Sequence, residues 1–426
     1  MRCQQFGHEV KWYDRPRDNG TPRRAGEGII EKIRDYDALR KKWIGWADMI
    51  YLPDNAHYLD MLEPFRKIGY PIFAPSVEAA ELELNRGAGQ RAMKAAGIPI
   101  MESKTFTDYP AAIRFVQKNP HFLVSKPSGD ANKALSYVAH DADDMAYMLE
   151  RWSEREDLVK AAKEEGFLLQ EKKTGCEMAV GGWFGPGGWS KWFCENWEYK
   201  KLMAGDMGPA TGEMGTLVRL VRHSKLAEQV LLPMTKTLEQ LEYVGYIDNN
   251  CIIDKVNPWP MEFTIRDGWP LRHNLTALIK NEDPAQWMLD MLNGHDTIEA
   301  VENEVCVSIV MAIPDFPFSK LTNKEVSGIP IHGLEDIEHI HPSEVMMGEA
   351  SVSGVKVPHP VSAGDYILIA TGTGETITGA RASAYTAIRK IRMPNSPFFR
   401  PDIGRGRMVK QLPEVQKLGY AKGLTF

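Results

Sequence analysis

The stretch from Tyr246 to Arg272, YIDNNCIIDKVNPWPMEFTIRDGWPLR, constrains the fold of this chain more than any other. Two apolar, β-branched runs flank a Lys-Val-Asn-Pro turn, a pattern that predicts a β-hairpin. In such a hairpin Asn250 and Glu262 can lie side by side, and their oxygen atoms suit a hard cation. The same residues also fit an ordinary hairpin with one solvated glutamate.

Arg266, Asp267 and Gly268 follow directly at the end of the second predicted strand. A guanidinium group and a carboxylate at this place would face whatever the cation at Glu262 holds. Their position favours the interpretation of the hairpin as a ligand-binding site over that of a purely structural turn.

The chain has 426 residues and 43% hydrophobic content, which is enough for more than one hydrophobic core. Strands alternate with helices up to residue 73, which predicts a parallel α/β unit. The end of the chain is typical of a separate small α+β lobe. We therefore expect a multidomain α/β and α+β protein divided into residues 1–76, 77–295 and 296–426.

Composition excludes several classes of partner. The net charge of -6 and the pI near 6.0 give no general reason to expect DNA or an anionic membrane. The five cysteines form no CxxC pair, which disfavours a zinc site and a disulfide framework. No apolar run reaches membrane-spanning length and no signal peptide is evident, so we expect a cytoplasmic protein that acts on small molecules.

The N-terminal unit lacks the opening strand and glycine-rich turn with which a doubly wound domain normally begins. Either this domain is shortened or the start codon lies inside a longer reading frame. Asp54 and Asn55 follow a predicted strand at residues 47–52, where ligands of such sheets bind. The alternative interpretation of these two residues is a turn and helix cap.

Two glycine-containing segments are candidate ligand loops. Lys126 and Lys133 bracket a flexible loop after a strand that can wrap phosphate oxygens, although the GxxxxGK[ST] pattern is absent and solvated lysines are the alternative. The segment GDMGPATGEMGT at residues 205–216 has too much glycine for regular structure, so its backbone N–H groups can bind an anion or carboxylate. A plain surface loop is the alternative there. The four nearby tryptophans indicate sheet core and not a nucleic-acid surface.

The order of these motifs resembles the ATP-grasp ligases, and most closely the phosphoribosylamine–glycine ligase family. GDMGPATGEMGT is similar to the family loop DTGPNTGGMG, and MEFTIRDG is similar to IEFNCRFGDPE. The run GTGETITGARASAYTAIRKI, followed by FFRPDIG, resembles the family's final lobe. The resemblance implies an ATP-grasp domain at 77–295, a shortened Rossmann-like domain at 1–76 and a small C-terminal lobe with a tail at 296–426.

The resemblance also assigns roles to particular residues. It implies that Lys126 and Lys133 contact ATP phosphates, that Glu171 and Glu177 lie beside adenine and ribose, and that Glu262 binds Mg²⁺ or Mn²⁺. Lys126 and Arg266 would carry the catalytic charges. The implied substrate-binding residues are Asp54, Lys200, Asp206, Thr211, Gly212, Met214, Gly215 and Asp267.

The chain also departs from the family pattern. Arg86 stands where the family has its first ATP lysine, which keeps the charge but changes the donor geometry. Thr264 replaces the asparagine of the metal pair, so a ligand is weakened or comes from Asn250. Met207 and Glu213 alter the glycine loop. The sugar-phosphate turn at the N-terminus is missing.

The resemblance implies an ATP-dependent carboxylate–amine ligase that works through an acyl phosphate. Three alternatives stay open: a phosphoribosylamine–glycine ligase of purine biosynthesis, a paralogue that joins another carboxylate and amine, and a silent nucleotide-binding relative. We expect a monomer or a weak homodimer.

Overall fold

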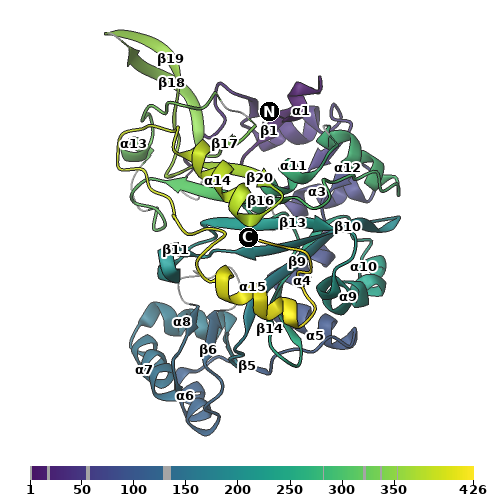
Figure 1. Cartoon of the computed structure of the whole chain (residues 1–426), viewed down its shortest axis with the longest axis vertical. Helices are drawn as coiled ribbons and strands as arrows, with labels where there is room; N and C mark the ends of the chain where they lie inside the picture. Colours follow the sequence, from purple (N-terminus) through teal and green to yellow (C-terminus); the bar gives the residue numbers. More distant parts are fainter. Residues whose placement is uncertain are drawn as a thin grey trace.

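The computed structural model describes residues 2–16, 20–53, 58–127, 136–281, 283–319, 323–335, 338–352 and 354–426. Its centre is an eight-stranded antiparallel sheet with the order β15-β14-β9-β10-β13-β16-β20-β17 (Figure 1). These strands are β9 (Cys176–Gly185), β10 (Gly188–Glu198), β13 (Gly215–Val221), β14 (Gly245–Ile253), β15 (Pro258–Thr264), β16 (Val305–Ala312), β17 (Ile340–Pro342) and β20 (Tyr366–Gly374).

The predicted hairpin is confirmed as β14 and β15 at one edge of this sheet. Asn250 lies directly opposite Glu262, as the sequence predicted. The turn is closed by Asp254, whose Oδ1 accepts hydrogen bonds from the backbone N–H groups of Val256 and Asn257 at 2.7 and 2.8 Å. Local turn chemistry therefore sets the register that places the candidate metal ligands together.

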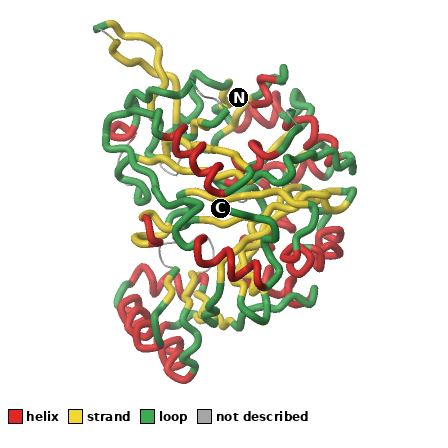
Figure 2. The backbone as a smooth tube through the Cα atoms, viewed as in Figure 1, coloured by secondary structure: helices red, strands yellow, loops and turns green. Residues whose placement is uncertain are grey.

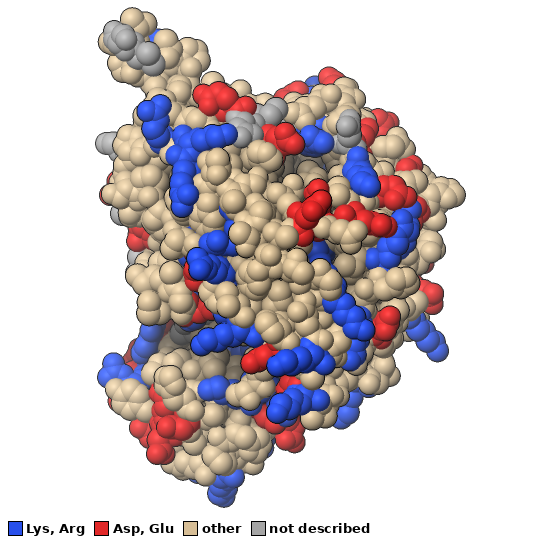
Figure 3. Space-filling view, in the orientation of Figure 1, with Lys and Arg blue, Asp and Glu red and all other residues tan. Residues whose placement is uncertain are grey.

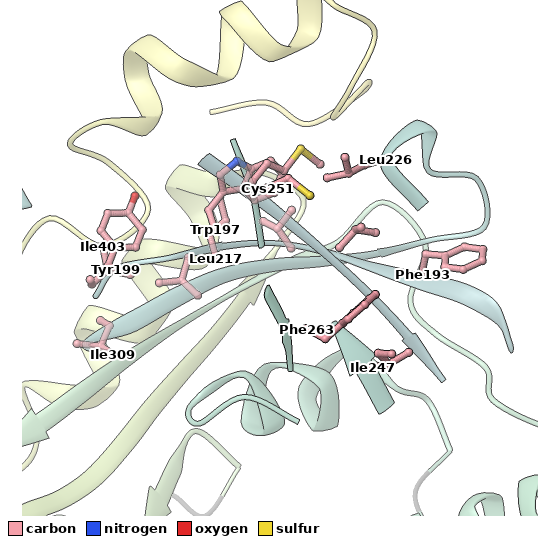
Figure 4. Close-up of a cluster of buried hydrophobic side chains, with 14 of the residues drawn as sticks. Phe193, Trp197, Tyr199, Leu217, Leu226, Ile247, Cys251, Phe263, Ile309 and Ile403 are labelled. Atoms are coloured by element: carbon pink, nitrogen blue, oxygen red, sulfur yellow. The ribbon is translucent and has the colours of Figure 1, made fainter. Parts of the chain in front are cut away.

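The two faces of the large sheet differ in what covers them. On one face, Ile247, Cys251 and Phe263 join the largest hydrophobic cluster, part of which is shown in Figure 4. Side chains alternate along a strand, so the neighbours of these residues point to the opposite face. There a second apolar cluster, which includes Trp183 and Trp192, packs against α11 (Leu271–Leu278) and α12 (Pro284–Leu292). The expectation that the tryptophans form sheet core is confirmed for these two and for Trp197, which is buried in the largest cluster on the other face.

A smaller lobe lies at the bottom of Figure 1 and contains a four-stranded sheet of order β5-β8-β6-β7. Its hydrophobic cluster is separate from the other two. The lobe consists of β5 (Ser103–Phe106), β6 (Val124–Pro127), β7 (Tyr137–Val138), β8 (Phe167–Gln170), α6 (Tyr109–Lys118), α7 (Ala142–Ser153) and α8 (Glu156–Glu165). Strand β6 carries Lys126 toward the large sheet.

Three stretches of the chain that could each form one long helix are divided into two helices in the structure. Asn85 accepts a hydrogen bond from the N–H of Ala88 and so begins a new helix, which sets Arg86 at its first turn. Pro233 falls in a short 3₁₀ segment, and Asp283 caps a helix of its own. The resulting helices are α4 (Val77–Leu84), α5 (Arg86–Ala95), α9 (Lys225–Val230), α10 (Thr235–Gln240), α11 and α12.

The N-terminal part contains two short parallel strand pairs, β1–β2 and β3–β4. Parallel pairing agrees with the predicted α/β unit. Its elements are α1 (Arg2–Gln5), β1 (Lys11–Tyr13), β2 (Glu31–Ile33), α2 (Tyr36–Ala38), a π-helical segment (Leu39–Trp43), β3 (Ile50–Tyr51), α3 (Leu59–Arg66) and β4 (Ile72–Phe73).

The C-terminal part continues the large sheet through β16, β20 and β17, so the sheet runs across the predicted boundary at residue 295. The predicted domain limits therefore stay a prediction. The hairpin of β18 (Val345–Val352) and β19 (Val355–Ser362) projects from the body (Figure 2). The remaining helices are α13 (Asn323–Val326), α14 (Ile377–Ile388) and α15 (Met408–Lys417). No helix in the described residues has the length and apolar character needed to cross a bilayer.

Candidate active site

Three cations from separate parts of the chain, Arg86, Lys126 and Lys200, lie near Glu262. Arg86, at the start of α5, places Nη2 3.2 Å from Oε2 of Glu262. Lys126 comes from β6 of the smaller lobe, and burial is the main reason that its pKa is lowered. The Glu262 carboxylate opposes that shift, while the charges of Arg86 and Lys200 add to it. The fold therefore brings together Arg86, Lys126 and Glu262, which the sequence could only propose.

A chain of polar contacts extends this cluster across the sheet. The Nδ2 group of Asn250 donates a 2.8 Å hydrogen bond to Oε2 of Glu198 on β10. The same carboxylate lies 2.9 Å from Nζ of Lys200. Burial alone would lower the pKa of Lys200, but the charges of Glu198 and Glu262 outweigh it and raise that pKa. Figure 3 shows lysine and arginine side chains, with some acidic ones, near the junction between the smaller lobe and the body.

The oxygen atoms around Glu262 fit a divalent cation that is shared with a ligand. Glu262 is 37% exposed, so its carboxylate is accessible, and the Asn250 side chain stands opposite. Thr264 is two residues further along β15 and therefore on the same face. Within the described ranges, no group of three His, Cys, Asp or Glu side chains is close enough to hold a metal alone. Magnesium sites commonly use one or two carboxylates plus substrate phosphates, so these residues fit such a site.

Arg266 and Asp267 take different positions at the end of β15. The guanidinium of Arg266 lies 3.9 Å from Oε1 of Glu83 and is 23% exposed. Asp267 is buried, and its Oδ2 accepts hydrogen bonds from Arg272 at 2.5 Å and from the hydroxyl of Tyr51 at 2.9 Å. This network fixes Asp267 between β3 and α11, which limits the candidate contact with substrate to its other oxygen.

The glycine loop is more regular than the sequence predicted. Strand β12 (Met207–Ala210) pairs with β11 (Lys201–Met203), and a single 3₁₀ turn (Ala204–Asp206) joins them. The expectation that no regular structure forms here was wrong, because Gly205 and Asp206 adopt positive φ angles of 72° and 56° and turn the chain into a tight ribbon. The local backbone can therefore pair as a hairpin despite its glycine content.

The candidate substrate residues of this loop differ in their burial and in the contacts that they already make within the protein. Asp206 lies 3.0 Å from Nη1 of the buried Arg400. Thr211 donates a hydrogen bond from both its N–H and its hydroxyl to the backbone oxygen of Lys200 at 2.8 Å. Gly212 is exposed. The Met214 side chain is fully buried, and Gly215 packs so closely that an added Cβ would lie 2.5 Å from the oxygen of Ser308.

Glu171 and Glu177 lie on either side of the segment that leads from β8 into β9. Glu171 is paired with Lys173, and its backbone N–H donates to the oxygen of Glu102 at 2.8 Å. Glu177 is 48% exposed and lies 2.7 Å from Nη1 of Arg407. Their roles beside a nucleotide stay a prediction. Asp54, Asn55 and Lys133 lie outside the described residues.

The sequence interpretation missed a set of buried polar residues on the same sheet face. Asn196 donates from Nδ2 to Oδ2 of Asp248 at 2.8 Å, and the Tyr246 hydroxyl donates to the same oxygen at 2.9 Å. A buried acid in an apolar strand such as YIDNNCII is the signal that could have found Asp248. Arg407 contacts both Glu177 and the backbone oxygen of Glu198.

Comparison with known proteins supports the fold described above. Residues 89–271 match the family model described as phosphoribosylglycinamide synthetase, ATP-grasp (A) domain. This part of the chain is therefore similar to the ATP-grasp domain of that family. The chain is 25% identical over 365 aligned residues, 83% of this chain and 81% of the relative, to the phosphoribosylamine–glycine ligase of Salmonella typhimurium. The ligase of Chlorobaculum tepidum is 24% identical, with 91% of this chain and 92% of the relative covered.

Solved ATP-grasp structures share the fold. A phosphoribosylamine–glycine ligase from Thermotoga maritima superposes with a TM-score of 0.67 at 20% identity, covering 94% of this chain and 95% of that one. An L-amino acid ligase from Bacillus licheniformis gives a TM-score of 0.57 at 12% identity and covers 93% and 94%. The predicted ATP-grasp fold and the resemblance inferred from the sequence are thus confirmed.

Proposed function

We propose that this ATP-grasp protein is an ATP-dependent carboxylate–amine ligase that joins phosphoribosylamine and glycine, with release of ADP and phosphate. The observation that carries the proposal is the convergence of Arg86, Lys126 and Lys200 on Glu262 in a fold shared with ligases of that name. The proposed cofactors are ATP and Mg²⁺, and the proposed partners are small-molecule substrates in the cytoplasm.

The reaction requires charge alignment more than covalent chemistry from the protein. A divalent cation held by Glu262 and Asn250 would neutralise phosphate oxygens. Lys126 and Arg86 can add positive charge at the transferring phosphoryl group, and Arg266 can orient the carboxylate that attacks it. The amine then displaces phosphate from the acyl phosphate. Because threonine stands at position 264 in place of the family's asparagine, Glu262 would be the principal metal ligand.

The test is to incubate the purified chain with ATP, MgCl₂, glycine and phosphoribosylamine formed from ribose 5-phosphate and ammonia. We expect release of ADP and phosphate that depends on both substrates, together with glycinamide ribonucleotide detected by mass spectrometry. Release only with another carboxylate and amine would point to a paralogue with different substrates. No release with any pair would contradict the proposed ligase activity.

A further inference from the structure

Residues 398–407 of the C-terminal part, FFRPDIGRGR, hold the turn of the glycine loop. Arg400 is buried, and its Nη1 lies 3.0 Å from Oδ1 of Asp206. Asp402 pairs with Arg400 at 2.8 Å and accepts a 3.0 Å hydrogen bond from the N–H of Gly205. Charge-assisted contacts from a distant part of the chain therefore fix the 3₁₀ turn of the loop.

Arg407, at the end of the same segment, lies between two carboxylates. Its Nη1 is 2.7 Å from Oε2 of Glu177 on β9 and 3.8 Å from Oδ2 of Asp206. Its Nη2 donates a hydrogen bond to the backbone oxygen of Glu198. The side chain of Arg407 is 18% exposed, whereas that of Glu177 is 48% exposed. The guanidinium is thus largely enclosed, while the carboxylate of Glu177 is open to a ligand.

Tyr199 links both arginines to the other end of the glycine loop. Its ring is fully buried, and the guanidinium carbons of Arg400 and Arg407 each lie 5.1 Å from the ring centroid. Cation–π contacts are strongest where water is excluded. The N–H of Tyr199 donates to the oxygen of Gly215 at 2.9 Å, and its backbone oxygen accepts from the N–H of Met214 at 2.8 Å. The loop is therefore joined to the arginines at both of its ends.

The guanidinium of Arg407 serves its two carboxylates unequally. In this structure Nη1 is within hydrogen-bond distance of Glu177 and beyond that distance from Asp206. Hydroxyl groups of a ligand that donate to Glu177 would share its oxygen atoms and weaken its hold on Arg407. The guanidinium would then be drawn toward Asp206, because the attraction between opposite charges rises as they approach. Ligand binding at Glu177 would in this way strengthen the contacts that hold the glycine loop.

We propose that Arg407 is a positioning residue that couples nucleotide binding at Glu177 to the ordering of the glycine loop at Asp206. The inference rests on the proposed function and on the predicted place of Glu177 beside the ribose of ATP. Two states differ in the principal partner of Nη1, which is Glu177 without nucleotide and Asp206 with it. A coupling free energy between two sites acts in both directions, so an ordered loop also favours nucleotide binding.

The experiment compares two nucleotides that differ only in the ribose hydroxyl groups. ATP or 2′,3′-dideoxy-ATP is added with MgCl₂ to the full chain at saturating concentration, without amine or carboxylate substrate. Hydrogen exchange of the backbone at residues 201–212 is followed by mass spectrometry. We expect ATP to slow this exchange by about fivefold or more, which is the lower end of typical coupling between sites. The dideoxy analogue should slow it much less, because it has no hydroxyl group to offer Glu177.

Substitutions separate this coupling from a purely structural role. Arg407→Gln should still bind ATP, measured by calorimetry, but lose the ATP-dependent slowing, because the amide has no charge to attract either carboxylate. Arg407→Lys should keep part of the effect and keeps the test valid if the glutamine variant fails to fold. The exposed Arg405→Gln is the matched control and should respond as the natural protein does. Equal effects of the two nucleotides, no effect of ATP on the natural protein, an undiminished effect in Arg407→Gln, or loss of ATP binding in both Arg407 variants would overturn the coupling.

The coupling and the ligase activity fail in different ways. An effect of ATP on residues 201–212 that depends on Arg407, without ADP release from any substrate pair, supports the coupling and contradicts the proposed function. Normal glycinamide ribonucleotide formation, with loop exchange that ATP slows equally in the natural protein and in Arg407→Gln, contradicts the coupling and leaves the function in place.

Discussion

The two faces of strand β14 are almost equally buried, but one carries mainly apolar side chains and the other also carries polar ones. Ile247, Cys251 and Ile253 pack into the largest hydrophobic cluster, while Asp248 and Asn250 point to the opposite face and engage other polar groups. Apolar burial contributes roughly 1.5–3 kcal/mol for each large side chain. A buried acid costs free energy unless it is paired. The comparison indicates that apolar packing stabilises the fold on both faces, and we propose that the polar residues Asp248 and Asn250 serve binding.

We expect the largest effect from a substitution that changes the polar residues of the site and leaves the apolar cluster intact. Glu262→Gln should lower kcat for the proposed ligation by about 10²–10³-fold, because the carboxylate that would hold the metal loses its charge. The melting temperature should change little, because Glu262 is 37% exposed. Activity is measured as substrate-dependent ADP release, with Glu239→Gln as the matched control. Full activity in the Glu262 variant would contradict the site assignment.

The apolar face should respond in the opposite way. Ile247 is fully buried, so Ile247→Ala should lower the free energy of unfolding by about 2–5 kcal/mol through lost burial and a residual cavity. Urea unfolding measures the change. Ile252→Ala on the same strand is the control, because that side chain is only partly buried and should cost less. Equal losses of unfolding free energy in the two variants would contradict the stated difference between the two faces.

The smallest effect is a pH dependence from Asp248. Burial, with the nearby Glu198 charge, raises the pKa of Asp248 from 3.8 to about 7. The folded protein therefore favours the protonated acid, and this contribution to stability is lost as pH rises through about 7. Stability should fall by about 1–3 kcal/mol between acidic and alkaline pH in the natural protein. Asp248→Asn should flatten that curve in urea unfolding at about pH 5 and about pH 8. A curve of the same slope in the variant would rule out Asp248 as the titrating group.

Predictions from the sequence succeeded where local chemistry decides the outcome. The hairpin, its turn and the pairing of Asn250 with Glu262 all follow from alternation and turn residues. The ATP-grasp fold was reached through resemblance to the family. Helix ends do not follow from spacing alone: Asn85 divides a run that has continuous helical spacing, because its side chain caps the second helix.

Sequence patterns could not predict that the buried acids Glu213 and Asp248 lie near each other. Glu213 and Asp248 belong to a loop and a strand with two helices between them, and neither forms a motif with the other. The glycine loop was also predicted as irregular, whereas positive φ angles at Gly205 and Asp206 allow a paired ribbon.

The sequence alone determined which residues alternate along β14 and β15 and where the turn between them falls, because these depend on neighbours in the chain. Only the tertiary structure decided that β9 and β10 lie between β14 and β13, and that Lys126 arrives from a separate lobe. That order depends on the burial of whole faces against distant helices. The electrostatic effect of Asp248 and the cations on Glu213 follows from this order, because it joins segments that are distant in the chain.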